Sequence, residues 1–167
     1  MFCANCGSAY NADDKFCPGC GQKLIETKKE VFVRNGLSEK DFIDNINKWF
    51  IYHPNVANVK ARFGIESSLG MLANKYVLNQ FVIEYEVYEN KNTMQYGLVK
   101  EENTGLYKKD IKDFIGAWQQ SHPNAKIVNW QGGTHQRGQV GSLMLGGIGA
   151  VNRMNAYIFF KFPRPNN

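Results

Sequence analysis

The stretch Gly36–Asn55 (GLSEKDFIDNINKWFIYHPN) has a second copy at Gly105–Asn124 (GLYKKDIKDFIGAWQQSHPN), which begins 69 residues further along the chain. Ten of the twenty aligned positions are identical, including one tryptophan and a complete His-Pro-Asn in each copy. The chain holds only three tryptophans and three histidines, so chance is a poor explanation for the match. An internal repeat of this kind indicates a duplicated structural unit.

Each copy predicts an amphipathic helix with defined ends. In the first copy, Ser38 and Asp41 have the spacing of a capping box with aspartate in place of glutamate. The His-Pro-Asn sequence ends each helix, because proline cannot continue it and a basic residue suits its negative C-terminal end. Apolar residues recur between these ends at helical spacing. They are Phe42, Ile46, Trp49 and Phe50 in the first copy, and Ile111, Phe114, Ile115 and Trp118 in the second.

Strands are expected on both sides of each helix, from short apolar or alternating runs. They cover Val31–Val33, Val56–Phe63, Gln80–Glu89, Met94–Lys100, Ala125–Trp130 and Asn155–Phe162. A polar turn at 90–93 predicts that the third and fourth of these strands pair as a hairpin. The last strand is apolar on both faces. Each copy therefore reads as strand, helix, strand, small apolar loop and strand.

This order predicts an α+β fold built from two β-α-β-β units. The simplest packing is one six-stranded, mostly antiparallel sheet, with two helices on one face and a pseudo-twofold axis between them. The predicted domains are a ribbon at 1–26, a linker at 27–30, the duplicated domain at 31–163 (repeat one 31–89, repeat two 94–162) and a tail at 164–167. The order resembles that of gyrase-inhibitory-protein-like effector-binding domains, a likeness that implies a small-molecule groove between the halves. Cystatin-like or lipoprotein-like duplicated sheets fit the same order.

All four cysteines of the chain lie near its N-terminus, at Cys3, Cys6, Cys17 and Cys20, with the spacing C-x2-C-x10-C-x2-C. Zinc prefers four soft ligands in a tetrahedron, and each C-x-x-C turn supplies two thiolates. Gly7 and Gly21 follow the two pairs and tolerate the backbone that turns amides towards the sulfurs. Two disulfides or a redox pair are the alternatives, and the absence of a thioredoxin-like context disfavours the redox pair.

The sequences Cys3-Ala-Asn-Cys6-Gly7 and Phe16-Cys17-Pro18-Gly19-Cys20-Gly21 resemble those of the zinc-ribbon family. The resemblance covers the first two dozen residues and implies that the four cysteines hold one structural Zn²⁺ ion. Four protein ligands leave the metal no open position for catalysis. A segment this short depends on its metal for folding energy.

Composition sets weaker limits on function. The net charge of +5 comes from 20 basic and 15 acidic residues, a mild bias that fits nucleic acid, an anionic surface or an ordinary soluble protein. No run approaches the roughly 20 apolar residues of a membrane span. A cysteine pair starts at residue 3, where a signal peptide would need charged and then apolar residues. We therefore expect a soluble, cytoplasmic protein of bacterial style, of unknown oligomeric state.

Candidate ligand-binding residues come from the third strand and from the glycine-rich segment 132–149. Glu84 and Glu86 project from the face opposite the predicted core, where they would receive a cationic ligand if that face lines the groove, or else form a solvated face. Met144 belongs to the glycine-rich segment, which would cover a pocket, dock a partner, touch a membrane surface or be a loop without a role.

A nucleic-acid surface is the alternative. Lys60 and Arg62 lie two apart on one strand and therefore share a face, and Arg137 and Arg153 would have to join them on one surface. The repeat equivalents of the first pair, Asn129 and Gln131, are not basic, which weakens this interpretation.

The histidines suggest either a symmetric site or two helix caps. His53 and His122 occupy equivalent positions, and the stop-signal logic favours C-caps. An enzyme would require one of these, or His135, to meet a carboxylate in a cleft. The sequence thus predicts a non-enzymatic zinc-binding protein whose duplicated domain binds a protein partner or small ligand, with nucleic-acid binding as the alternative.

Overall fold

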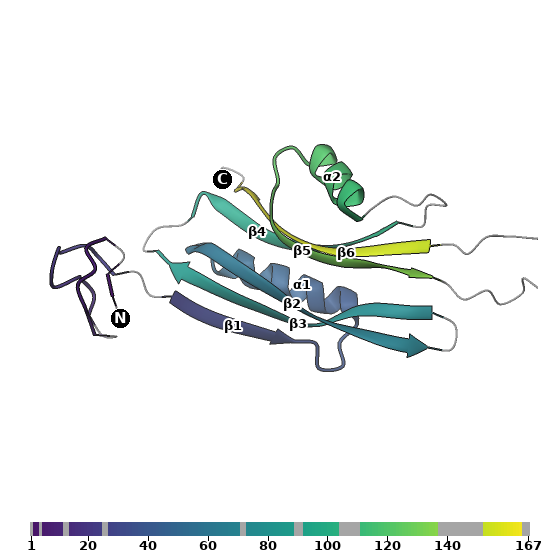
Figure 1. The fold of residues 1–167 in the computed structure, drawn as a ribbon, viewed down its shortest axis with the longest axis horizontal. Coiled ribbons are helices and arrows are strands. Elements are labelled where there is room, and N and C mark those ends of the chain that lie inside the picture. Colours follow the sequence, from purple (N-terminus) through teal and green to yellow (C-terminus); the bar gives the residue numbers. More distant parts are fainter. Residues whose placement is uncertain are drawn as a thin grey trace, which may run out of the picture.

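The structure, a computed structural model, describes residues 2–3, 5–11, 14–24, 27–70, 73–88, 92–103, 111–136 and 152–164. After the N-terminal module come two units with the same order of elements, strand, helix, strand and strand (Figure 1). The first unit contains β1 (Thr27–Val33), α1 (Glu39–Tyr52), β2 (Val56–Gly70) and β3 (Ala73–Val87). The second contains β4 (Met94–Asn103), α2 (Ile111–Ser121), β5 (Lys126–Gln136) and β6 (Asn152–Pro163). The predicted α+β class is confirmed.

Each unit forms its own antiparallel sheet of three strands. The strand order is β1-β3-β2 in sheet one and β4-β6-β5 in sheet two, so the last strand of each unit is the central one. This shared connectivity is what a duplicated unit would produce. The prediction of a single six-stranded sheet is wrong, because the six strands are split between two sheets (Figure 1).

The helices also lie differently from the prediction that both cover one face. α1 packs between sheet one and β4, whereas α2 covers the side of sheet two that faces away from sheet one (Figure 1). The two units are therefore stacked, with the inner face of sheet two resting on α1 and on β2 and β3. Face-to-face stacking buries the apolar inner face of sheet two, which edge-to-edge pairing of the sheets would leave in water.

β6 explains why stacking is favoured. Its side chains alternate between two apolar clusters, and the four residues Ala156 to Phe159 are all 0% exposed. Tyr157 and Phe159 join the cluster with α1 and sheet one, while Ala156 and Ile158 join the cluster with α2. The Phe159 ring lies 5.5 Å from that of Phe50 on α1 and 5.3 Å from that of Phe81 on β3. A strand that is apolar on both faces, as the sequence predicted, needs a layer on each side.

The two helices differ at the positions that contact the other unit. On α1, Ile43 and Phe50 are buried in the shared cluster and Asn47 bonds to β4. The α2 residues at the same repeat positions are Lys112, Gly116 and Gln119. Lys112 and Gly116 are exposed. α1 thus packs against both sheets, whereas the described residues of α2 pack against sheet two alone. The stack of the two units therefore ends at α2.

Two element boundaries and one strand pairing also differ from the sequence prediction. Residues 27–30, predicted as a linker, belong to β1, because an exposed edge strand tolerates the charged side chains of this segment. The β2–β3 hairpin extends through residues that the sequence assigned to a loop, up to the pair Gly70 and Ala73. The predicted 80–89 hairpin with 94–100 does not form, since β3 pairs with β1 and β2 and β4 pairs with β6.

The helix start is as predicted. Ser38 is the N-cap of α1, its side chain accepts a bond from the Asp41 backbone N–H at 3.1 Å, and its hydroxyl donates to the Asp41 carboxylate at 2.6 Å. The turn before it needs a positive φ at Gly36 (81°), which explains the glycine at the start of the repeated stretch. Of the helices in the described part of the chain, none is long and apolar enough to cross a membrane.

Candidate functional site

The N-terminal module is built from two matching turns, each holding one cysteine pair. The Gly7 N–H donates to the Cys3 carbonyl and the Gly21 N–H to the Cys17 carbonyl, both at 2.8 Å. Both glycines have positive φ angles, 73° at Gly7 and 70° at Gly21. Single β-bridges, Phe2 with Ala9 and Phe16 with Lys23, flank the turns. The glycines therefore have the role that the sequence suggested.

The four sulfur atoms of Cys3, Cys6, Cys17 and Cys20 lie within 4.8 Å of one another. Cys3 Sγ is 3.8 Å from Cys20 Sγ, and Cys6 Sγ is 3.5 Å from Cys17 Sγ. Zn–S bonds of about 2.3 Å in a tetrahedron place sulfurs about 3.8 Å apart. A disulfide would bring two of them to about 2.05 Å. The donor set and its spacing fit one structural zinc ion with a closed shell.

The surroundings shift the pKa values of the thiols in opposite directions. Backbone amides of Cys6 and Asn5 lower the pKa of Cys3, and the Ser8 hydroxyl lowers the pKa of Cys6 to about 6. Burial raises the pKa of Cys17 to about 11. Bound Zn²⁺ holds cysteine as thiolate, so its charge acts against the effect of burial at Cys17.

The two described histidines of the repeat are helix caps. His53 is the C-cap of α1, and its backbone N–H donates to the Trp49 carbonyl at 3.0 Å while its Nδ1 lies 2.7 Å from the same oxygen. His122 repeats both contacts with Trp118, at 3.1 and 2.9 Å. Each imidazole also stacks on its tryptophan, with ring centroids 4.0 and 4.3 Å apart. The C-cap interpretation is confirmed, and the stacking was not foreseen.

Four of the predicted ligand-binding and nucleic-acid residues meet on one surface. Glu84, Lys60 and Arg62 all project from the outer face of sheet one, on which Glu84 is paired with Lys60 in the strand register and Arg62 makes an ion pair with Glu84. Glu86 lies on the same face and accepts bonds from Asn58 and Tyr88. The acids are therefore not in a groove between the units, and they offset the bases beside them.

The side chains of the remaining candidates lie outside the described part of the chain. Met144 and Arg137 lie outside the described residues, as does most of the glycine-rich segment 132–149, and for Arg153 and His135 only the backbone is described, in β6 and β5.

A cleft lies between the two units, but its lining differs from the one that the sequence predicted and includes neither Glu84 nor Glu86. It has a volume of about 410 Å³ and lies between the first half of α1 and the middle of β4. Its lining residues are Glu39, Lys40, Ile43, Asp44, Asn47, Leu98, Val99 and Lys100. The cleft therefore has an apolar part and a charged rim in which two acids face two bases.

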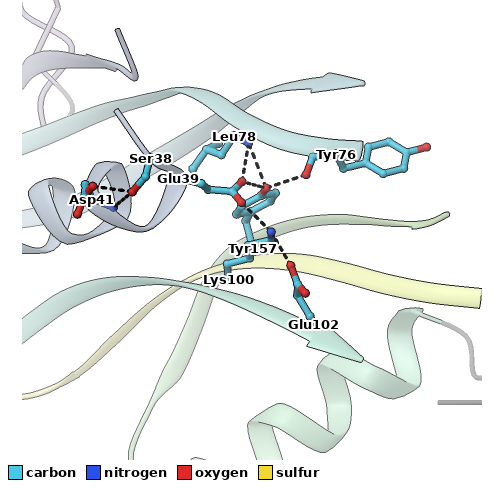
Figure 2. Close-up of polar contacts among 8 residues, drawn as sticks. All are labelled: Ser38, Glu39, Asp41, Tyr76, Leu78, Lys100, Glu102 and Tyr157. Carbon is cyan, nitrogen blue, oxygen red and sulfur yellow. Dashed lines mark hydrogen bonds and ion pairs between the residues drawn. The ribbon is translucent and has the colours of Figure 1, made fainter. Parts of the chain in front are cut away.

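A cluster of polar side chains lies beside this cleft (Figure 2). Lys100 Nζ is 2.6 Å from both a Glu39 and a Glu102 carboxylate oxygen. The Tyr157 hydroxyl contacts the Glu39 carboxylate and lies 3.0 Å from the Tyr76 carbonyl. The Leu78 N–H donates to both Glu39 and Tyr157, at 3.1 Å each. The cluster thus joins α1 and β3 of the first unit to β4 and β6 of the second.

The cluster takes the place of a missing strand. β1 pairs with β3 only as far as Val33 and Gln80, and the Arg34 N–H makes one more bond to the Asn79 carbonyl. Beyond that point, the Leu78 N–H donates to the side chains of Glu39 and Tyr157 and not to a strand. Buried backbone groups need partners, and Glu39 and Tyr157 supply them.

Burial and hydrogen bonding act against each other on these groups. Burial raises the pKa of Glu39, but bonds from Lys100, Tyr157 and the Leu78 N–H outweigh it and leave the pKa below its usual value. Burial lowers the pKa of Lys100, and its bonds to Glu102 and Glu39 reverse that effect. Burial and the adjacent Glu39 carboxylate raise the pKa of Tyr157. The stable state of the cluster is therefore an ionised Glu39 facing a charged Lys100 and a neutral Tyr157.

Comparisons with known proteins agree with the metal centre. A family model for the zinc-ribbon domain matches residues 2–24, which confirms the resemblance seen in the sequence. No curated protein and no solved structure matches the chain. The chain therefore begins with a zinc ribbon, and the two β-α-β-β units have to be interpreted from their own geometry.

Proposed function

We propose that the chain is a non-enzymatic zinc-binding protein whose paired β-α-β-β units bind a protein partner or small ligand in the cleft between α1 and β4. The zinc ion has a stabilising role, since four thiolates leave it no position for a substrate. We further propose a cytoplasmic location, because a reducing compartment keeps the four thiols available for zinc.

The observation that supports this proposal is the position of the cleft. One wall comes from the first unit and the other from the second, so neither unit forms the cleft alone. Its volume of about 410 Å³ lies within the roughly 300–1,000 Å³ of small-molecule sites. Apolar atoms with a few convergent polar groups are the usual lining of such sites. The sequence predicted a groove between halves with Glu84 or Glu86 in its wall, and the proposal transfers that role to Glu39 and Lys100.

A fragment screen by NMR tests the proposal on the zinc-loaded full chain. We expect fragments to change the amide shifts of Ile43, Leu98 and Val99 in a concentration-dependent way. Asp44→Tyr places a large side chain at the cleft wall on a half-exposed helix position and should abolish these changes. Lys48→Tyr, one turn further along α1, is the matched control and should preserve them. Shifts that appear only elsewhere, or that survive Asp44→Tyr unchanged, would refute the proposal.

A further inference from the structure

β4 is an edge strand, and one of its sides faces away from β6. In an antiparallel ladder, the N–H and C=O of successive residues point alternately towards the partner strand and away from it. The Leu98 N–H and C=O both contact the Asn47 side chain, at 2.7 and 2.9 Å, and therefore point away from β6. The register of β4 and β6 has no shift, so the N–H and C=O of Lys100 point to the same side.

Asn47 bonds to this edge as a neighbouring strand would. Its amide nitrogen donates to the Leu98 carbonyl and its amide oxygen accepts from the Leu98 N–H, the pair of bonds that a peptide unit exchanges in a ladder. The next outward-directed position, Lys100, lies in the wall of the cleft. Along the edge of β4, the outward backbone groups of Leu98 are therefore covered by α1, and those of the next outward residue, Lys100, lie at the cleft.

The charges of the cleft restrict what can bind there. Lys100 is paired with Glu39, and Lys40 with Asp44 at 2.8 Å, so the lining holds two bases and two acids that already neutralise each other. A phosphate or a nucleotide would find no surplus of positive charge. A neutral backbone with apolar side chains suits the lining better, because Ile43, Leu98 and Val99 supply its apolar part.

Taking the proposed cleft function as its basis, we infer that the occupant is an extended peptide segment of a protein partner, which adds to β4 as a fourth strand of sheet two. Its backbone bonds to the N–H and C=O of Lys100, and its alternate side chains enter the cleft. An edge strand that faces a helix across a cleft is the geometry of peptide binding by strand addition. Backbone bonds supply affinity in this mode, and the side-chain pockets supply specificity.

The test begins with selection of random heptapeptides displayed on phage against the zinc-loaded full chain. The strongest peptide is then titrated by fluorescence anisotropy, and amide hydrogen exchange is followed by NMR. We expect the peptide to slow exchange of the Lys100 N–H by about tenfold or more, since that amide gains a partner. The Val99 N–H, which already points to β6, should change little. Alternation of this kind distinguishes an added strand from any other ligand in the cleft.

Two variants at one position separate backbone from side chain. Lys100→Ala and Lys100→Pro both remove the ammonium group, but only proline also removes the outward N–H. An edge strand tolerates proline at a position whose N–H points outwards. We expect Lys100→Pro to weaken peptide binding about tenfold relative to Lys100→Ala. If Lys100→Pro fails to fold, the exchange measurement on the unchanged chain decides.

The outcomes separate this inference from the proposed function. Equal binding by the two variants, or selected peptides that leave the Lys100 N–H unprotected, would overturn strand addition. Fragments that still shift Ile43 and Leu98 would in that case leave the cleft as a small-molecule site. Selection of no peptide at all, together with no fragment binding, would overturn both.

Discussion

Glu39 links the two units more directly than any other described side chain. Its carboxylate accepts bonds from Lys100 on β4, Tyr157 on β6 and the backbone of β3, although it sits in the first turn of α1. Its folded-state pKa is lowered, so the carboxylate stabilises the fold above its ordinary pKa of 4.5. That contribution is lost as the pH falls through the lower pKa of the folded state.

Glu39→Gln should therefore destabilise the protein near neutral pH and matter less in acid. We expect a loss of about 1–3 kcal/mol in the free energy of unfolding at pH 7, the usual effect of leaving buried polar groups unpaired. The difference from the unchanged chain should shrink as the pH falls below 4.5 and through the lower pKa of folded Glu39, because both chains then carry a neutral side chain. Urea unfolding across pH measures both effects. Asp44→Asn, which alters an exposed pair, should change stability by less than about 0.5 kcal/mol.

Asn47 offers a second comparison between neighbours on one helix. Asn47→Ala removes both partners of the Leu98 backbone and should lower the free energy of unfolding by about 1–3 kcal/mol. Asn45→Ala changes the same residue type at an exposed position of α1 and should have almost no effect. Urea titration of the zinc-loaded protein distinguishes them. Equal stabilities of the two variants would mean that water replaces the Asn47 amide at the edge of β4.

At the scale of elements, the ribbon and the two sheets are held together by different forces. The ribbon has two buried cysteines, Cys3 and Cys17, and its aromatic residues Phe2 and Phe16 are 77% and 59% exposed. The two units instead share the large apolar cluster around Phe159. We therefore expect the ribbon to depend on its metal, and the units to be independent of it.

Removal of zinc should unfold the ribbon and leave both units folded. Structural zinc contributes about 10–16 kcal/mol to the folding of ribbon-sized peptides, far more than the burial available here. After EDTA treatment we expect the NMR signals of residues 2–24 to collapse to random-coil positions. The indole signals of Trp49 and Trp118 should keep their dispersion. Cooperative loss of all signals on chelation would show that the ribbon supports the units.

The helices, strands and metal site could be predicted because each depends on a local sequence pattern. The arrangement of the elements could not, because it depends on contacts between residues far apart in the chain. Helix ends followed from Ser38 and His53, and the metal site followed from cysteine spacing alone. The polar cluster has no such signal, because Glu39 and Tyr157 are 118 residues apart in the chain. The division into two sheets had a weak signal, the replacement of Ile43 and Phe50 by Lys112 and Gln119 in the second copy. The similarity between the copies suggested a symmetric arrangement of the two helices. The differences at these positions arise because α1 contacts the other unit on this face and α2 does not.

At the scale of the whole molecule, polar surfaces end the stack after two units. Sheet two rests on α1 through an apolar face. The corresponding face of sheet one is its outer face, which carries Lys60, Arg62, Glu84 and Glu86 beside the exposed Val31 and Val33 of β1. The exposed positions of α2 are polar or small (glycine and alanine). In repeat proteins, polar outer faces on the terminal units prevent further stacking. Charged or polar side chains thus occupy both ends of this two-unit stack, beside the two exposed valines of β1.

The same surface argues against tight nucleic-acid binding. Arg62 pairs with Glu84, and Lys60 lies opposite the same carboxylate, so their positive charge is offset locally. In fluorescence anisotropy with labelled single- and double-stranded DNA and RNA, we expect weak binding even at low salt. Glu84→Gln combined with Glu86→Gln should strengthen it, with a steeper dependence on salt. Tight binding by the unchanged chain would return attention to Lys60, Arg62, Arg137 and Arg153.

The central place of β6 in sheet two also fixes when the protein can fold during its synthesis. β4 and β5 each pair with β6 and not with each other, so neither has a ladder partner until β6 leaves the ribosome. At about 5–20 residues per second, roughly 3 to 12 seconds separate the start of β4 from the start of β6. Throughout that interval, the face of α1 that will hold sheet two has no cover. During this interval the nascent chain therefore exposes an apolar surface, of the kind that chaperones bind.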